Sequence, residues 1–160
     1  MSTSIAPKKL MLALCAGEMW ARTSSSIRCP YTACALIIYR NSKTKVDPDG
    51  NRRYGETNAS EKVQLEADRK WWPIADARRR HLKAIAYYVD GYLKRVRAVD
   101  PDGRWQADDR GYWDVPVGPP MSEVEIAAMF GPHLQLGEWR LPVKGKLREY
   151  IPIQPPKNAK

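Results

Sequence analysis

The apolar residues between positions 74 and 99 recur at a spacing that predicts one long amphipathic helix. When successive residues are turned by about 100°, six apolar side chains fall within an arc of roughly 100°, the usual width of a core-facing helix surface. The basic side chains gather along one flank of the same projection, with Tyr87 at its edge and with Asp76 and Asp90 interrupting it. The apolar set consists of Leu82, Ile85, Val89, Tyr92, Leu93 and Val96, and the basic flank consists of Arg79, Arg80, Lys83, Lys94 and Arg97.

A second helix is expected just before this segment, from about residue 59 to residue 72. Ser60 or Asn58 can cap its first turn, and Glu61 places a carboxylate near the positive end of the helix. Pro73 lacks a backbone donor, so it either ends this helix or begins the next one. Both helices are expected at the centre of the domain.

Two strands are expected outside the helical region. Residues 33–40 are apolar without alternation, which is typical of a strand buried on both faces. Residues 111–117 carry Trp113, Val115 and Val117 at alternate positions, which predicts a strand with one apolar face.

The last third of the chain is expected to hold a short helix and a β-hairpin. Ser122 and Glu125 stand at the two positions of a capping box, which predicts a helix over residues 123–130. Residues 136–153 read as a hairpin whose prolines favour edge positions. The sequence therefore predicts a small α+β domain with central helices and small flanking sheets.

One domain accounts for most of the 160 residues. We expect it to span residues 7–153, with flexible ends at residues 1–6 and 154–160. The turn sequence Asp-Pro-Asp-Gly occurs at residues 47–50 and again at residues 100–103. It predicts two turns of the same kind rather than an internal repeat.

Charge is the clearest global signal in the composition. The chain has 27 Lys and Arg against 18 Asp and Glu, which gives a net charge of +9. Residues 1–56 and residues 57–99 each carry a net charge of +5, whereas residues 100–160 carry −1. This uneven excess favours a polyanionic partner, either nucleic acid or a nucleoprotein, and an acidic protein surface is the alternative.

Cysteine and histidine give little support for a metal site or a disulfide framework. The cysteines are Cys15, Cys29 and Cys34, an odd number that suits free thiols in a reducing cytoplasm. Cys29 and Cys34, with His81 and His133, could offer four zinc ligands, but the two cysteines are spaced more widely than most ligand pairs. We therefore expect buried thiols, no cofactor and a cytoplasmic protein.

The hydrophobic pattern predicts no association with a membrane. The apolar run before Cys15 is only about six residues, shorter than the roughly 7–15 residues of a signal-peptide core. No stretch approaches the ~18 apolar residues of a membrane span. Residues 8–21 are expected to form a short amphipathic helix instead.

Neighbouring aromatic and basic residues indicate how a polyanion would be bound. Trp71 and Trp72 follow two cations, and such pairs are typical of proteins that stack bases and neutralise the backbone of single-stranded nucleic acid. On a helix, adjacent tryptophans point about 100° apart, so either both pack in the core or one faces a partner. The leading hypothesis is a non-enzymatic module that binds nucleic acid or a nucleoprotein. Its expected contact residues are Arg79, Arg80, Lys83, Lys94 and Arg97, with Trp72 or Tyr87 stacking.

Two other functions are compatible with the same residues. A protein–protein interaction, assembly or inhibitor component, such as a small viral or mobile-element accessory or virion protein, would use the same Trp, Tyr and Arg surface. A metal-free basic ribonuclease would use His81 and His133 as acid and base, with Lys83 or Arg140 assisting. Because the histidines are far apart in sequence and belong to no recognisable catalytic motif, we expect that the protein is not an enzyme.

Overall fold

Two antiparallel strands occupy the segment in which the apolar spacing predicted one long helix. The computed structural model describes residues 33–153. In these residues, β4 (Leu82–Val89) and β5 (Tyr92–Val99) pair through a two-residue turn. The short α3 (Asp76–Arg79) is the helical part of this segment. The helix predicted over residues 74–99 is therefore wrong.

The turn between β4 and β5 explains the difference. Asp90 has a φ of 50° and Gly91 a φ of 90°, and positive φ at both central residues is what a type I′ hairpin turn requires. A Cβ atom at position 91 would also lie 2.7 Å from Nε1 of Trp139, so the site admits only glycine without a shift. The Asp-Gly pair thus reverses the chain at a point where a helix would have to continue.

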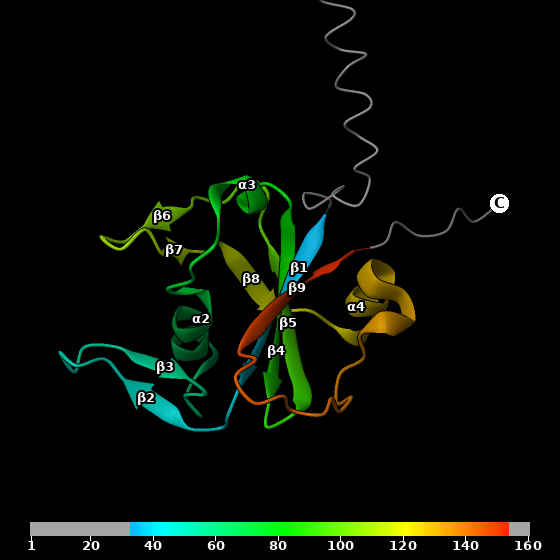
Figure 1. The fold of residues 1–160 in the computed structure, drawn as a ribbon, viewed down its shortest axis with the longest axis horizontal. Coiled ribbons are helices and arrows are strands. Elements are labelled where there is room, and N and C mark those ends of the chain that lie inside the picture. The colour runs from blue at the N-terminus through cyan, green and yellow to red at the C-terminus, as the bar shows by residue number, and fades with distance from the viewer. Residues whose placement is uncertain (1–32, 154–160) are drawn as a thin grey trace, which may run out of the picture. The chain divides into compact units, whose positions relative to one another are not determined.

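A five-stranded sheet forms the centre of the described residues, in the order β8-β5-β4-β1-β9 (Figure 1). β1 (Cys34–Arg40) runs parallel to β4 and antiparallel to β9 (Arg148–Pro152). At the other edge, β8 (Val117–Pro120) pairs antiparallel with β5. The buried strand predicted at residues 33–40 is confirmed, because β1 has a neighbour on each side and its first five residues are buried.

α2 and two small hairpins cover one side of the sheet, and α4 covers the other (Figure 1). We call these the α2 side and the α4 side. One hairpin pairs β2 with β3, and the other pairs β6 with β7. The mixture of helices and sheets confirms the predicted α+β class. The bounds are α2 Glu61–Arg69, β2 Thr44–Val46, β3 Arg53–Gly55, β6 Gln106–Ala107, β7 Trp113–Asp114, α4 Glu123–Phe130 and the 3-10 turn η3 Gly131–His133.

The first turns of α2 and α4 carry the predicted capping residues. In α2, Oγ of Ser60 accepts from the amide of Val63 at 3.5 Å. In α4, Oγ of Ser122 accepts from the amide of Glu125, whose carboxylate accepts from the amide of Ser122 in return. The helix predicted over residues 123–130 is confirmed, and the other predicted helix is present as the shorter α2.

The C-terminal segment differs from the hairpin predicted over residues 136–153. Residues 148–152 form β9, which pairs with β1 rather than with a second strand of its own. Residues 136–147 are irregular with turns at 136–137 and 144–145, and Trp139 makes an isolated bridge to Tyr92. A proline and two glycines in this stretch interrupt the backbone ladder that a hairpin would need.

Proline and glycine also set the shorter connections. Pro116 separates β7 from β8, so the strand predicted near residues 111–117 is present as two short strands. Both Asp-Pro-Asp-Gly turns are confirmed by a hydrogen bond from the glycine amide to the first aspartate carbonyl, at 2.8 Å and 3.1 Å. The expected flexible ends, the domain start at residue 7 and the helix expected over residues 8–21 lie outside the described residues.

The sheet separates two apolar cores. On the α2 side the strands pack with Ile74 and Val115, and on the α4 side they pack with Ile126 and Phe130. Successive residues of β1 alternate between the two cores, as expected for a strand buried on both faces. The main strand residues are Leu36, Ile38, Ile85 and Tyr87 on the α2 side and Ala35, Ile37, Ala84, Ala86 and Tyr88 on the α4 side.

Candidate nucleic-acid interface

The predicted basic flank is divided among different elements, and its β5 members face the α2 side. Arg97 and Tyr87 both have 0% exposed surface. Neither side chain is accessible to a partner in this structure, which argues against the contact roles predicted for them. Lys94 is half exposed, but its ammonium lies 3.1 Å from the carboxylate of Glu56.

Asp68 is the centre of a buried group of ion pairs between α2 and the sheet. Its carboxylate is 0% exposed and accepts hydrogen bonds from Arg40, Arg95 and Arg97 at 2.5–2.9 Å. Nε2 of Gln64 donates to the same carboxylate at 2.9 Å. Because the three arginines stand on β1 and β5, Asp68 ties both strands to α2.

Glu56 occupies a similar position directly after β3. Its carboxylate is 2% exposed and accepts from Arg40 at 2.6 Å and from Arg95 at 2.5 Å. A bulge in β5 lets the adjacent Lys94 and Arg95 both face Glu56. Glu56 therefore holds the base of the β2–β3 hairpin against the sheet.

These ion pairs change the acidity of both carboxyl groups. Burial alone would raise the pKa of Glu56, but hydrogen bonds and positive charge from Arg95 and Arg40 outweigh it and lower the pKa to about 2. The pKa of Asp68 is also lowered, because the same two arginines outweigh the effect of burial. Both groups are ionised at neutral pH, so each of the cations facing them has a carboxylate partner inside the protein.

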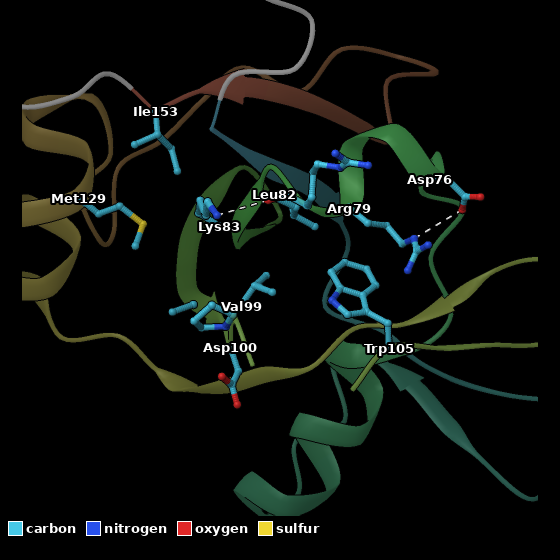
Figure 2. A pocket seen from close by; sticks show the side chains of 12 residues that line it. Asp76, Arg79, Leu82, Lys83, Val99, Asp100, Trp105, Met129 and Ile153 are labelled. Carbon is cyan, nitrogen blue, oxygen red and sulfur yellow. Dashed lines mark hydrogen bonds and ion pairs between the residues drawn. The ribbon is translucent and has the colours of Figure 1, made fainter. Parts of the chain in front are cut away.

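A hollow of about 730 Å³ lies beside α3, between the start of β4, the end of β5 and α4 (Figure 2). We call it the α3 hollow. It brings together Arg79, Arg80 and Lys83 of the predicted flank. Met129 of α4 and Ile153 form part of its apolar wall (Figure 2).

The α3 hollow has a mixed charge. Nε of Arg79 lies 3.4 Å from the carboxylate of Asp76, and Nζ of Lys83 donates to the carbonyl of Arg80 at 3.3 Å (Figure 2). Asp100 adds a second carboxylate to the wall. Three cations thus share this hollow with two anions, which weakens its attraction for a phosphate chain.

A second hollow, of about 340 Å³, has cations in its wall and no carboxylate. It lies between the end of β1, the β2–β3 hairpin, the end of α2 and the start of β9, and we call it the inner hollow. Lys43, Lys45 and Arg148 are exposed there and form no ion pair with any other described residue. Arg40 and Lys70, which do form ion pairs, complete the basic wall.

A third hollow, of about 700 Å³, lies between the turn of the β2–β3 hairpin and the turn of the β6–β7 hairpin. We call it the outer hollow. Half-buried aromatic rings line it, and a cation stands over each of three of them. The pairs are Arg52 with Tyr54 (5.8 Å from the guanidinium carbon to the ring centre), Lys70 with Trp71 (5.7 Å from the ammonium nitrogen) and Arg110 with Tyr112 (4.4 Å from the guanidinium carbon).

The inner and outer hollows share Tyr54, Lys70 and Trp72 in their walls, and we call the two together the hairpin groove. Nε1 of Trp72 donates to the carbonyl of Asp68 at 2.8 Å, and its ring packs on the α2-side core. Trp71 belongs to neither apolar core of the described residues and lines the outer hollow. Both rings are half-buried, with Trp72 packed against the core and Trp71 outside it, which is nearer to the expected arrangement of one ring in the core and one facing a partner.

Sequence reasoning did not place Lys43, Lys45, Tyr54 and Arg148 among the expected contact residues. Lys43 and Lys45 are two residues apart on an extended segment, and such a spacing places both side chains on one face. Lys45 stands opposite Tyr54 in the β2–β3 ladder, so a hairpin prediction would have found these three. Arg148 has no such local signal, because it reaches the groove only through the pairing of β9 with β1.

The other candidate chemistry stays without a defined site. Within residues 33–153, no group of three or more His, Cys, Asp or Glu side chains is placed to hold a metal ion. Cys34 is a free, buried thiol, and Cys29 lies outside the described residues. His81 precedes β4 and His133 stands in η3, and their pairing in a ribonuclease stays a prediction. No helix in the described part of the chain is long and apolar enough to cross a membrane.

Comparisons with protein-family models, with curated proteins and with solved structures found no match to this chain. The function is therefore inferred from the charge and geometry of the hairpin groove.

Proposed function

We propose that residues 33–153 form a non-enzymatic module that binds nucleic acid, free or within a nucleoprotein, through the hairpin groove. The wall of the inner hollow supports this most directly, with five basic side chains and no carboxylate. Neutralisation of phosphates by Lys and Arg supplies most of the sequence-independent affinity for nucleic acid. The aromatic rings of the outer hollow continue the same surface.

The charge balance favours the hairpin groove over the α3 hollow. The groove presents seven basic and two acidic side chains, whereas the α3 hollow presents three basic and two acidic ones. Concave surfaces lined by one sign of charge concentrate the electrostatic potential and attract ligands of opposite sign. A polyanion is therefore drawn to the groove first.

Two charge-reversed variants test this assignment. Lys43→Glu with Lys45→Glu alters the inner hollow, and Arg80→Glu with Lys83→Glu alters the α3 hollow. All four side chains are exposed, and the two double variants change the net charge equally. Fluorescence-anisotropy titrations of labelled DNA and RNA are expected to show loss of binding in the first variant and near-wild-type binding in the second.

The salt dependence of the same titration gives an independent readout. For a single strand, the logarithm of affinity should fall linearly with the logarithm of salt, with a slope that corresponds to about three to five neutralised phosphates. The inner-hollow variant should have a shallower slope. No binding of the wild type at low salt, or loss of binding only in the α3-hollow variant, would contradict the proposal.

A second candidate function, protein–protein interaction within an assembly, is favoured by exposed apolar side chains between β5 and β9. Trp139 is 53% exposed, and Leu141 and Leu147 are 71% and 72% exposed. Large exposed apolar residues close together in sequence are typical of interaction surfaces. A pull-down with Leu141→Asp/Val143→Asp, two exposed side chains outside the hairpin groove, beside the wild type, each with and without nuclease treatment, separates the two functions. A partner protein that is still recovered after nuclease treatment, but is not recovered with the variant, supports protein–protein interaction.

We also infer a cytoplasmic location, because the chain has an odd number of cysteines and Cys34 is a free thiol. Fractionation of host cells followed by immunoblotting tests this. Recovery of the protein outside the cytoplasmic fraction would contradict it.

A further inference from the structure

We propose that the hairpin groove takes a single strand, with phosphates in the inner hollow and bases in the outer hollow. This inference rests on the proposed nucleic-acid function and specifies the form of the ligand and its placement. It follows from the different charge of the two hollows, which share one wall, and from the rings of Trp71 and Tyr112, which line the outer hollow but not the inner one.

The inner hollow offers several cations to a phosphate, beside apolar side chains such as Ile38, Ala67 and Leu147. Lys45 approaches it from β2, Lys43 from the residue just before β2, and Arg148 from β9. These three cations form no ion pair with another described residue, so phosphates can neutralise them without displacing a carboxylate. No acidic side chain lines the wall, and the carboxylates behind it, such as Glu56 and Glu66, are already paired with Arg40 and Lys70.

The outer hollow suits bases rather than phosphates. Asp47 and Asp49 would repel a phosphate, but their carboxylates can accept hydrogen bonds from the amino groups at base edges. Tyr54, Trp71 and Tyr112 offer ring surfaces on which bases can stack. The cations over these rings limit the orientations available to them, which lowers the entropy lost on binding.

A duplex cannot use this arrangement. Its bases are paired and stacked inside the helix, so they cannot enter a hollow between two hairpin turns. A duplex would contact only the exposed cations, and the half-buried rings would add nothing to its affinity. At about 700 Å³ the outer hollow falls in the size range of sites that enclose small ligands, which allows room for unstacked bases.

Three ligands of equal length test the strand and base requirement with the unmodified protein. They are a labelled 12-residue single strand, an abasic strand with the same phosphates, and a duplex, all titrated at one salt concentration. The single strand is expected to bind at least about 10-fold more tightly than either of the others, since stacking on aromatic side chains accounts for a difference of this order.

A pair of matched variants locates the stacking. Trp71→Ala is expected to weaken binding of the single strand about 10-fold and to leave binding of the abasic strand unchanged. Trp139→Ala, which removes an exposed tryptophan outside the groove, should change neither. Thermal melts of both variants show that the fold is retained.

The outcomes separate this inference from the function on which it rests. Binding of the abasic strand or the duplex as tightly as the single strand would overturn the inference and leave nucleic-acid binding in place. Equal losses for the intact and the abasic strand in Trp71→Ala would also overturn it. No binding of any of the three ligands would overturn both.

Discussion

The two sides of the central sheet use the same strands for different purposes. On the α4 side, Ala84, Ala86 and Tyr88 of β4 pack against an apolar helix. On the α2 side, the neighbouring residues face a layer that contains every buried charged side chain found in residues 33–153. The charged residues are Glu56, Asp68, Arg95, Arg97 and Asp114.

The two sides therefore contribute differently to the stability of the fold and to the geometry of the hairpin groove. Apolar packing stabilises the α4 side without specifying a binding surface. Buried ion pairs add little net stability compared with apolar packing, but they fix the geometry of the groups that they join. Here they join the β2–β3 hairpin and α2 to the sheet, and these are the elements that carry the hairpin groove.

The largest effect is expected from removing the carboxylate at the centre of the α2 side. Asp68→Ala leaves Arg40, Arg95 and Arg97 without their shared partner, and such a loss costs about 3–5 kcal/mol. Chemical denaturation measures this loss as a decrease in the free energy of unfolding. Asp76→Ala is the control, because Asp76 is 80% exposed and its loss should cost no more than about 0.5 kcal/mol. Equal stability of the two variants would contradict the role given to Asp68.

Acid should weaken the α2 side selectively. The pKa of Glu56 is about 2 in the folded protein, whereas its ordinary value is 4.5, so its contribution is complete above pH 4.5 and is lost as the pH falls toward 2. When the free energy of unfolding is measured from pH 7 to pH 2, it should decrease between pH 4.5 and pH 2. Glu56→Gln should be less stable than the wild type at pH 7, and the difference should shrink as the pH approaches 2. A difference that is constant with pH would contradict the ion-pair account.

The turn between β4 and β5 joins two strands that contribute residues to both cores. Gly91→Ala forces a positive φ on a residue with a Cβ atom and crowds Trp139, which should cost about 1–3 kcal/mol. Thermal unfolding is the measurement. The pH dependence of stability should match that of the wild type, and a changed dependence would show that the turn acts through the α2-side ion pairs.

The smallest effect is expected on the α4 side. Ile126→Val removes one methylene from the buried face of α4 and should cost about 0.5–1.5 kcal/mol, measured by denaturant unfolding. Nucleic-acid affinity and the acid profile should stay as in the wild type. A loss of affinity would show that the two sides are not independent.

The elements that follow local chemistry could be predicted from the sequence. The capping box at Ser122 fixes the start of α4, and the unbroken apolar run after Ala33 identifies β1 as a central strand. The helix prediction for residues 74–99 was wrong because the apolar residues of these two strands, β4 and β5, also fit a helical period. The Asp90-Gly91 pair is the local signal that distinguishes the two, since it favours a two-residue hairpin turn.

The candidate site was less accessible to sequence reasoning because its location depends on pairing between distant segments. Arg97 appears as an exposed cation on a helix but becomes a buried ion-pair partner once it stands on a central strand. Arg148 reaches the groove through β9, which lies more than 100 residues after β1 in the chain. The adjacent tryptophans both line the groove, but the stacking ring expected from the sequence was Trp72, whereas the ring proposed from the structure is Trp71.

Mapping the contact by ultraviolet crosslinking tests most directly the claim that the α2 side carries the binding function. A single strand is crosslinked to the wild-type protein, and the modified peptides are identified by mass spectrometry. We predict crosslinks at Tyr54, Trp71 and Tyr112, three rings that line the outer hollow on the α2 side. Crosslinks confined to peptides from α4 and the segment that follows it would contradict the account.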